Sequence, residues 1–223
     1  MKKVIGCYRL IPQFWAGYLL FSIPVCMYCF MIEKGTGFLL INRMHNTLLD
    51  LFFESFTNIG NGIFIICVAL FYIIRKKTGL AFQIILGFII SGLFVQIVKH
   101  LAPRPRPKMF FGHDCHIHCI NGITGTGYSS FPSGHTASIF SLVVLLSIYY
   151  CQKKSKTNFC FYFLTIAVLT AYSRVYLSQH FPIDVLAGSL IGVLVSLAVY
   201  VFSPISIFEN NFLKVDWQSV KLH

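Results

Sequence analysis

The sequence predicts an all-α, polytopic integral membrane domain built as a bundle of six helices. Three observations predict this fold class. Of the 223 residues, 56% are hydrophobic and only 11% are charged, whereas an ordinary soluble domain has about 25% charged residues. The mean hydropathy is +0.72. In addition, six apolar runs approach the ~20 residues that a helix needs to cross a bilayer.

The six runs are continuously apolar and do not alternate between apolar and polar residues. A membrane β-barrel needs that alternation, whereas a membrane helix needs an apolar stretch. We therefore expect helices, within a single membrane domain over residues 1–223. The predicted spans are residues 14–32, 57–74, 80–98, 136–150, 159–177 and 183–202.

The first run follows Lys2 and Lys3, an arrangement that signal peptides share. Its apolar stretch exceeds the usual length of about 7–15 residues, and no small-residue cleavage site follows it. We expect a helix that is retained.

Residues 48–56 are apolar, but Asp50 and Glu54 stand four positions apart among them. This pattern predicts a helix that lies in the membrane interface. The alternative is that the two carboxylates join a functional site.

The chain carries 18 Lys and Arg against 7 Asp and Glu, a net charge of +11. The basic residues form short clusters between apolar runs, which favours lipid head groups as partners and argues against nucleic acid. Short basic loops stay in the cytoplasm, so both termini, including the tail 204–223, are predicted to be cytoplasmic. The clusters are Lys2, Lys3 and Arg9; Arg75, Lys76 and Lys77; Lys153, Lys154 and Lys156; and Lys214 and Lys221.

The opposite, extracytoplasmic side then holds residues 33–56, 99–133 and 173–182. Lys99, Arg106 and Arg174 all fall at this face. Each charge facing lipid at the bilayer centre would cost about 2.5–3.5 kcal/mol, or roughly 8–10 kcal/mol for the three. Snorkelling to lipid head groups would explain one such residue. Three of them at one face predict a polar, anion-binding cavity.

The residue types at this face suit phosphoryl transfer, which spreads negative charge over three oxygens. Arg offers a planar fork to those oxygens, and Lys offers a point charge. Ser133 and Gly134 precede an expected helix, where backbone N–H groups bind anions and glycine permits close approach.

His180 and Asp184 are four residues apart, so they share one face if a helix starts near Pro182. A carboxylate in this position holds the imidazole in one tautomer and leaves its other nitrogen free to attack. His135 could then protonate the leaving oxygen.

Three motifs, in this order along the chain, resemble the signatures of a known family. Lys99-x6-Arg106-Pro107, Pro132-Ser133-Gly134-His135 and Ser173-Arg174-x5-His180-x3-Asp184 resemble the signatures of the type 2 phosphatidic acid phosphatase superfamily, which includes vanadium haloperoxidases. The resemblance covers about residues 46–202. The repeated Arg-Pro makes Arg104 a competitor, but the six-residue gap selects Arg106.

The resemblance implies specific roles. His180 would attack phosphorus to form a phosphohistidine, Asp184 would orient it, and His135 would be the general acid. For a phosphatase of this family, the resemblance implies a reaction without a metal or cofactor. The implied phosphate ligands are Lys99, Arg106, Ser133, Gly134 and Arg174.

The implied function is hydrolysis of lipid phosphate monoesters or diphosphates at the outer face of the inner membrane. Undecaprenyl diphosphate, phosphatidylglycerophosphate, phosphatidic acid and lipid A phosphates remain open as substrates. A lipid phosphotransferase that uses the same histidine and a non-catalytic lipid-binding protein are the alternatives.

Cys115 and Cys119 lie in the external segment, where we expect a disulfide to close the loop. The alternatives are a zinc site with His113, His116 and His118, although the spacing matches no standard structural site, and two free thiols. Residues 124–127 (TGTG) are not followed by Gly-Lys-Ser or Gly-Lys-Thr, so they predict a flexible loop and not a P-loop.

Overall fold

The computed structural model describes residues 11–112, 117–120, 122, 124–152 and 159–203. In this part of the chain the regular elements are helices, which confirms the all-α fold class. They are α2 (Pro12–Met31), α3 (Lys34–Asn42), α4 (Thr47–Phe56), the 3₁₀ turn η1 (Thr57–Gly60), α5 (Gly62–Ile74), α6 (Thr78–Leu101), α7 (Pro107–Phe111), α8 (Gly134–Gln152), α9 (Phe159–Tyr176) and α10 (Pro182–Phe202).

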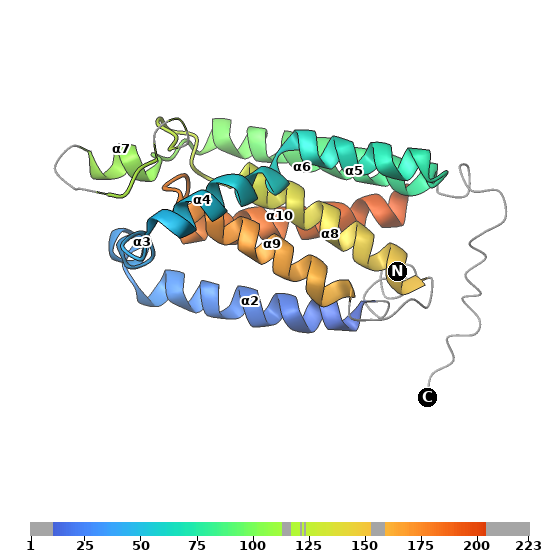
Figure 1. The fold of residues 1–223 in the computed structure, drawn as a ribbon, viewed down its shortest axis with the longest axis horizontal. Coiled ribbons are helices and arrows are strands. Elements are labelled where there is room, and N and C mark those ends of the chain that lie inside the picture. Colours follow the sequence, from blue (N-terminus) through green and yellow to red (C-terminus); the bar gives the residue numbers. More distant parts are fainter. Residues whose placement is uncertain (1–10, 113–116, 121, 123, 153–158, 204–223) are drawn as a thin grey trace.

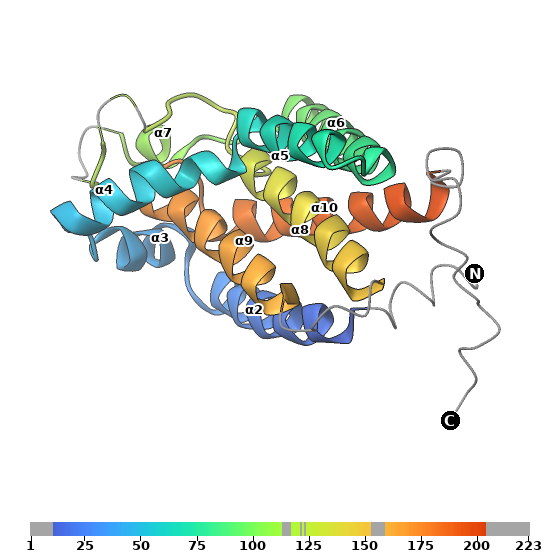
Figure 2. The same ribbon diagram turned by 45° about the vertical axis from the view of Figure 1, so that its right-hand side comes forward.

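Helix α8 forms the centre of the bundle and packs mainly against α10, α6 and α9. Every residue from Thr136 to Ile148 is buried, as expected for a helix that is apolar on all sides. In both ribbon views, α5 and α6 lie on one side of the inner helices and α2 lies on the other (Figures 1 and 2).

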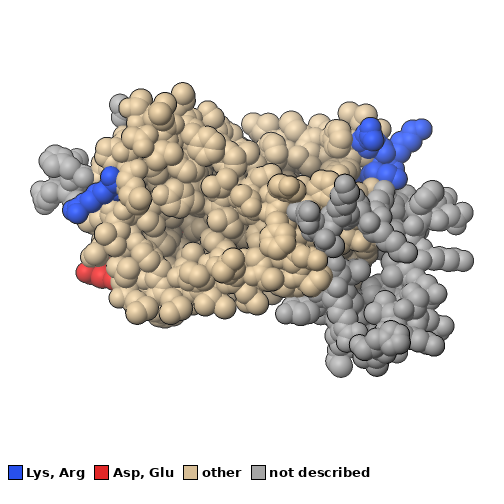
Figure 3. Space-filling model, turned by 60° about the horizontal axis from the view of Figure 1, so that its bottom comes forward, with Lys and Arg blue, Asp and Glu red and all other residues tan. Residues whose placement is uncertain are grey.

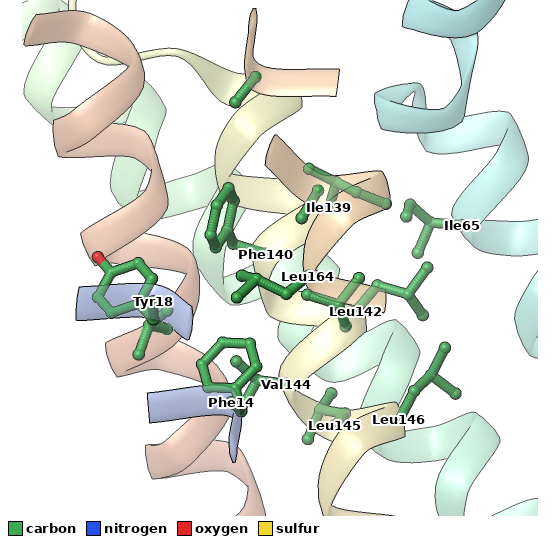
Figure 4. Close-up of a cluster of buried hydrophobic side chains, with 14 of the residues drawn as sticks. Phe14, Tyr18, Ile65, Ile139, Phe140, Leu142, Val144, Leu145, Leu146 and Leu164 are labelled. Atoms are coloured by element: carbon green, nitrogen blue, oxygen red, sulfur yellow. The ribbon is translucent and has the colours of Figure 1, made fainter. Parts of the chain in front are cut away.

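The largest hydrophobic cluster joins helices that are far apart in the sequence. Phe14 and Tyr18 of α2 face Phe140 of α8, and Leu164 of α9 lies beside them (Figure 4). Ile65 of α5 packs on the other side of α8. This cluster determines how α8 stands relative to its neighbours.

Two glycines allow α10 to approach α8 closely. A Cβ atom on Gly188 would lie 2.5 Å from the Ser133 carbonyl oxygen, and one on Gly192 would collide with the Ala137 carbonyl oxygen. Small residues let helix backbones approach closely in membranes. The contact brings the start of α8 next to the start of α10, and therefore two of the three motifs together.

The outer surface is apolar between the two ends of the bundle. On the face shown in Figure 3, the described Lys and Arg residues lie near the two ends, with uncharged residues between them. Large apolar side chains such as Leu20, Phe30, Ile74 and Phe202 are 77–83% exposed. Among the described residues, five helices are long and apolar enough to cross a membrane, or six if a bent pair counts as one span.

The structure differs from the prediction at the start of the second span. The sequence predicts a continuous helix over residues 57–74, whereas the chain bends by 57° between Thr47–Gly60 and Gly62–Ile74. Asn61 breaks the helix because its side chain accepts a hydrogen bond from the Ile63 N–H at 3.4 Å and caps α5. A Cβ on Gly60 would lie 3.0 Å from the His135 Cβ, so the break packs against a candidate site residue.

Helix α4 covers the segment expected to form an interfacial helix. Leu48 and Leu51 on α4 are exposed. Asp50 instead accepts hydrogen bonds from the Tyr176 hydroxyl at 2.6 Å and pairs with His118 Nε2 at 2.9 Å. The carboxylate of Asp50 therefore belongs to a separate polar cluster, outside the group of predicted phosphate ligands.

Candidate active site

The predicted site residues meet at one end of the bundle. Helices α6 and α9 end there and α8 and α10 begin there, beside α3, α4 and α7, whereas the α5–α6 connection lies at the opposite end (Figure 1). The charges of Lys99, Arg106 and Arg174 act on one another and on His135. The backbone N–H of Ser133 donates to the Asp184 carbonyl at 2.9 Å, which ties the second motif to the third.

Asp184 is fully buried and held in place by several hydrogen bonds. Its Oδ2 atom accepts from the Ser130 hydroxyl at 2.5 Å and from the Phe181 backbone N–H at 2.9 Å. His180 Nδ1 lies 3.7 Å from the same oxygen, which is longer than a hydrogen bond. The carboxylate therefore faces the imidazole, and a small shift would join them.

His180 lies in the short connection between α9 and α10 and is only 2% exposed. Its backbone N–H donates to the Arg174 carbonyl at 3.1 Å, which fixes the position of the residue. Burial lowers the pKa of His180 to about 4, and the Asp184 carboxylate opposes this shift. The imidazole is therefore neutral at physiological pH, as a nucleophile must be.

The two arginines of the site are each held by one polar side chain. Arg174 Nη1 donates to the Thr57 hydroxyl at 2.7 Å, and Arg106 Nη1 donates to Gln179 Oε1 at 2.5 Å. The Nε atoms of both arginines are buried and have no hydrogen-bond partner among the described residues. Unpaired buried donors are costly, so these groups are suited to an anionic ligand.

The cations also lack carboxylate partners. In the part of the chain that the structure describes, the ion pairs join His118 to Asp50 and His180 to Asp184. None of them involves Lys99, Arg106 or Arg174. Asp184 is a carboxylate neighbour of Lys99 and Arg106, and Arg174 adds a third positive charge, so the site has a net positive charge.

The structure separates Arg106 from its competitor Arg104. The Arg104 guanidinium lies over the Phe131 ring at 4.6 Å and is exposed, and its backbone pairs with Tyr128 and Ser130. Arg106 is the arginine whose charge acts on Lys99. The six-residue spacing therefore selects the residue that lies among the other cations.

Residues 124–127, where the sequence predicts a flexible loop, pack against the site. The Thr124 hydroxyl accepts from the Ile120 N–H at 3.0 Å and donates to the Leu177 carbonyl at 3.3 Å. A Cβ on Gly125 would collide with Arg106 Nη1. Glycine is needed here because the backbone lies directly against a guanidinium group.

Sequence reasoning missed three residues that hold the site in place: Thr57, Ser130 and Gln179. Ser130 and Gln179 lie within three residues of the second and third motifs, so proximity in the sequence was a usable signal. Thr57 lies 117 positions from Arg174. Only the packing of η1 against α9 places it there.

The external cysteines and histidines are only partly described. Cys115, His113 and His116 lie outside the described residues, and Cys119 carries a free thiol in the structure. His118 pairs with Asp50 and stacks on His45, with 3.9 Å between the ring centroids. The predicted Cys115–Cys119 disulfide stays a prediction.

Comparison with known proteins identifies the family. Residues 80–207 match the model of the PAP2 superfamily. The chain belongs to the PAP2 superfamily. The match spans more than half of the chain and includes all three motifs, so it confirms the resemblance. With its long apolar helices, this PAP2 protein is an integral membrane protein.

Curated relatives of this PAP2 chain include lipid phosphatases. A lipid A 4′-phosphatase from Porphyromonas gingivalis is 27% identical over 182 residues, which cover 78% of this chain and 73% of the relative. "Probable lipid phosphate phosphatase 4" from Arabidopsis thaliana is 29% identical over 175 residues, or 66% of this chain. The chain spans 57% of the length of this Arabidopsis relative.

Two solved structures share the fold. The crystal structure of Aquifex aeolicus LpxE has 30% sequence identity and a TM-score of 0.61, over 73% of this chain and 92% of that chain. A transmembrane PAP2 type phosphatidylglycerolphosphate phosphatase from Bacillus subtilis also has a TM-score of 0.61, over 95% of this chain and 100% of that chain. Its sequence identity is 21%, so it supports the fold alone.

Proposed function

We propose that this protein is a lipid phosphatase that hydrolyses phosphate monoesters or diphosphates of membrane lipids. The observation that carries the proposal is the cluster of Lys99, Arg106 and Arg174, whose charges act on His135, beside the buried His180–Asp184 pair. The buried, unpartnered Nε donors of the two arginines match the oxygens of a phosphoryl group. The names of the relatives support a lipid as the molecule that carries this group.

The proposed first step uses the His180–Asp184 pair. Because Nδ1 of His180 faces Asp184, the lone pair of Nε2 is free to attack phosphorus. The N–P bond forms as the P–O bond to the lipid breaks, and His135 gives its proton to the departing oxygen. The cations, together with the backbone N–H group of Gly134, stabilise the charge on the phosphoryl oxygens.

In the second step, water attacks the phosphohistidine. His135 now accepts a proton from the water, the N–P bond breaks, and inorganic phosphate leaves with His180 neutral again. The proposed steps use only side chains and backbone groups of this chain, so we expect phosphate release to continue in the presence of a chelator.

Phosphate release by the purified protein in detergent, with excess chelator, tests this proposal. The panel contains undecaprenyl diphosphate, phosphatidylglycerophosphate, phosphatidic acid and lipid A. We expect release from at least one lipid in chelator, and a loss of at least a thousandfold in His180→Ala because the nucleophile is absent.

His100→Ala is the matched control, because His100 is exposed on α6 and, within the described part of the chain, bonds to the Gln96 carbonyl of its own helix. Its activity should stay within twofold of the unmodified protein. A thermal melt of both variants checks that His180→Ala still folds. Full activity in a folded His180→Ala, or activity that chelator abolishes, would contradict the proposal.

A further inference from the structure

A groove opens beside the candidate site, between the end of α2, the start of α3 and the start of α10. Its volume is about 400 Å³, including the space at its open side. Its walls are mainly apolar, and its charged side chains are Glu33 and Lys34. The residues that line it are Tyr28, Cys29, Ile32, Glu33, Lys34, Gly37, Phe181, Pro182 and Ile183.

Lys34 is a half-buried cation without a carboxylate partner among the described residues. Its ammonium lies 3.9 Å from the centroid of the Phe181 ring and 5.0 Å from that of Phe110. Aromatic faces attract a cation but do not neutralise it. Burial lowers the pKa of Lys34, so a negative charge nearby would stabilise its protonated form.

The start of α3 adds further positive potential at this point. Lys34 is the first residue of this nine-residue helix, and no side chain caps it. The first N–H groups of a helix have no partner within the helix, and its N-terminus carries a partial positive charge. Glu33 beside it is exposed, so water screens its charge more than that of Lys34.

The groove is adjacent to the reacting groups. Phe181 forms part of its wall, follows the candidate nucleophile His180 directly, and donates its N–H to Asp184 at 2.9 Å. The charges of Asp184 and Arg104 act on Lys34. A ligand with one anionic group at His180 therefore has a second cation within reach, separated from the first site by the Phe181 ring.

We infer that Lys34 and the start of α3 form a second anion subsite, which recognises a further phosphate on the same lipid substrate. This inference rests on the proposed lipid phosphatase function and names its substrate class. Lipids with two phosphate groups are preferred over lipids with one. Lys34 is a specificity residue here, and it takes no part in bond breaking at His180.

Three lipids with the same acyl chains test the inference. Phosphatidic acid has one phosphate, diacylglycerol diphosphate has two that are adjacent, and phosphatidylglycerophosphate has two that are separated by glycerol. The unmodified protein should show a higher kcat/KM on at least one of the two-phosphate lipids. Lys34→Gln should lower that value about tenfold, or about 1.4 kcal/mol, and leave phosphatidic acid within twofold.

Two variants serve as controls. Lys34→Arg retains the charge and should keep the preference. Lys108→Gln removes a charge from an exposed position on the nearby α7 and should change neither lipid class. An equal loss on all three lipids in Lys34→Gln, or an unmodified protein without a preference, would overturn the inference.

A binding measurement separates this inference from the proposed function. Inorganic pyrophosphate should raise the melting temperature of the unmodified protein more than phosphate does, and Lys34→Gln should remove the difference. This readout needs no turnover, so it remains informative if no lipid is hydrolysed. Equal stabilisation by the two anions in the unmodified protein would refute the subsite.

Discussion

At the residue scale, the environment of His180 explains how an ordinary imidazole can serve as a nucleophile. The side chain is 2% exposed, and burial disfavours its charged form. The neighbouring Arg174 and Arg106 act in the same direction, and Asp184 acts against them. The result is a neutral imidazole in a site that is otherwise positively charged.

The pKa of about 4 for His180 predicts the acid side of the pH profile. Protonation removes the attacking lone pair, so kcat/KM should fall as the pH drops through about 4 and not near the usual 6.5. His135 must carry a proton in the complex with the anionic substrate, so kcat should fall at the alkaline side and the pH profile of kcat should be bell-shaped. Initial rates between pH 3.5 and 10 measure both limbs.

An acid limb near pH 6.5 would contradict the burial argument for His180. A rate that rises monotonically from pH 4 to 9 would instead contradict the role of His135 as the general acid.

At the element scale, the contact between α8 and α10 supports the whole site. The two helices touch at Gly188 and Gly192, where the carbonyl oxygens of Ser133, just before α8, and of Ala137 in α8 leave no room for a Cβ. The same contact sets the Ser133 N–H against the Asp184 carbonyl. Helix packing and site geometry therefore depend on the same pair of glycines.

Gly192→Ala is expected to destabilise the protein by about 1–3 kcal/mol, because the added methyl group overpacks the α8 backbone. Thermal unfolding in detergent should show a lower melting temperature, together with reduced phosphatase activity. Gly92→Ala on α6 is the matched control, since its Cβ would meet no atom within 4 Å.

Alanine is the better helix former by about 1 kcal/mol, so Gly92→Ala should leave the melting temperature unchanged or raise it. Equal behaviour of Gly192→Ala and Gly92→Ala would show that the α8–α10 contact tolerates a methyl group.

The bend between α4 and α5 also contributes to the site. A straight helix over residues 57–74 would remove the 3₁₀ turn that carries Thr57. With the bend, the Thr57 hydroxyl accepts from Arg174, and Gly60 packs against His135. Through this bend, the second span contacts Arg174 of the third motif and His135 of the second motif.

At the scale of the whole molecule, two groups of Lys and Arg residues lie at opposite ends of the bundle. The cations of the site gather at one end, whereas Arg75, Lys76 and Lys77 follow α5 at the other end (Figure 1). On the face shown in Figure 3, uncharged residues lie between the two ends. By the positive-inside rule, we expect the site to face the outside of the inner membrane.

Alkaline phosphatase fusions test this topology, because the reporter needs disulfides that form only outside the cytoplasm. A fusion after Asn121 should be active, and a fusion after Ser155 should be inactive. Matched expression levels of the two fusions are the control. The reverse pattern would place the site in the cytoplasm.

The sequence by itself determined the membrane fold class, the family and the set of candidate site residues. Apolar runs of bilayer length can be recognised locally, because a membrane span depends on its own composition. The motif residues are recognisable because their type and spacing reflect the chemistry they serve. Lys99, Arg106, His135, Arg174, His180 and Asp184 could all be named in this way.

The tertiary structure alone decided which other residues meet the site. Thr57 reaches Arg174 across 117 positions, and Lys34 reaches Phe181 from a different helix. Neither position has a local signal, because such contacts depend on how closely the helices pack and where a helix bends. Packing at Gly188 and Gly192 and the break at Asn61 are properties of pairs of elements, so they emerge only when the chain is folded.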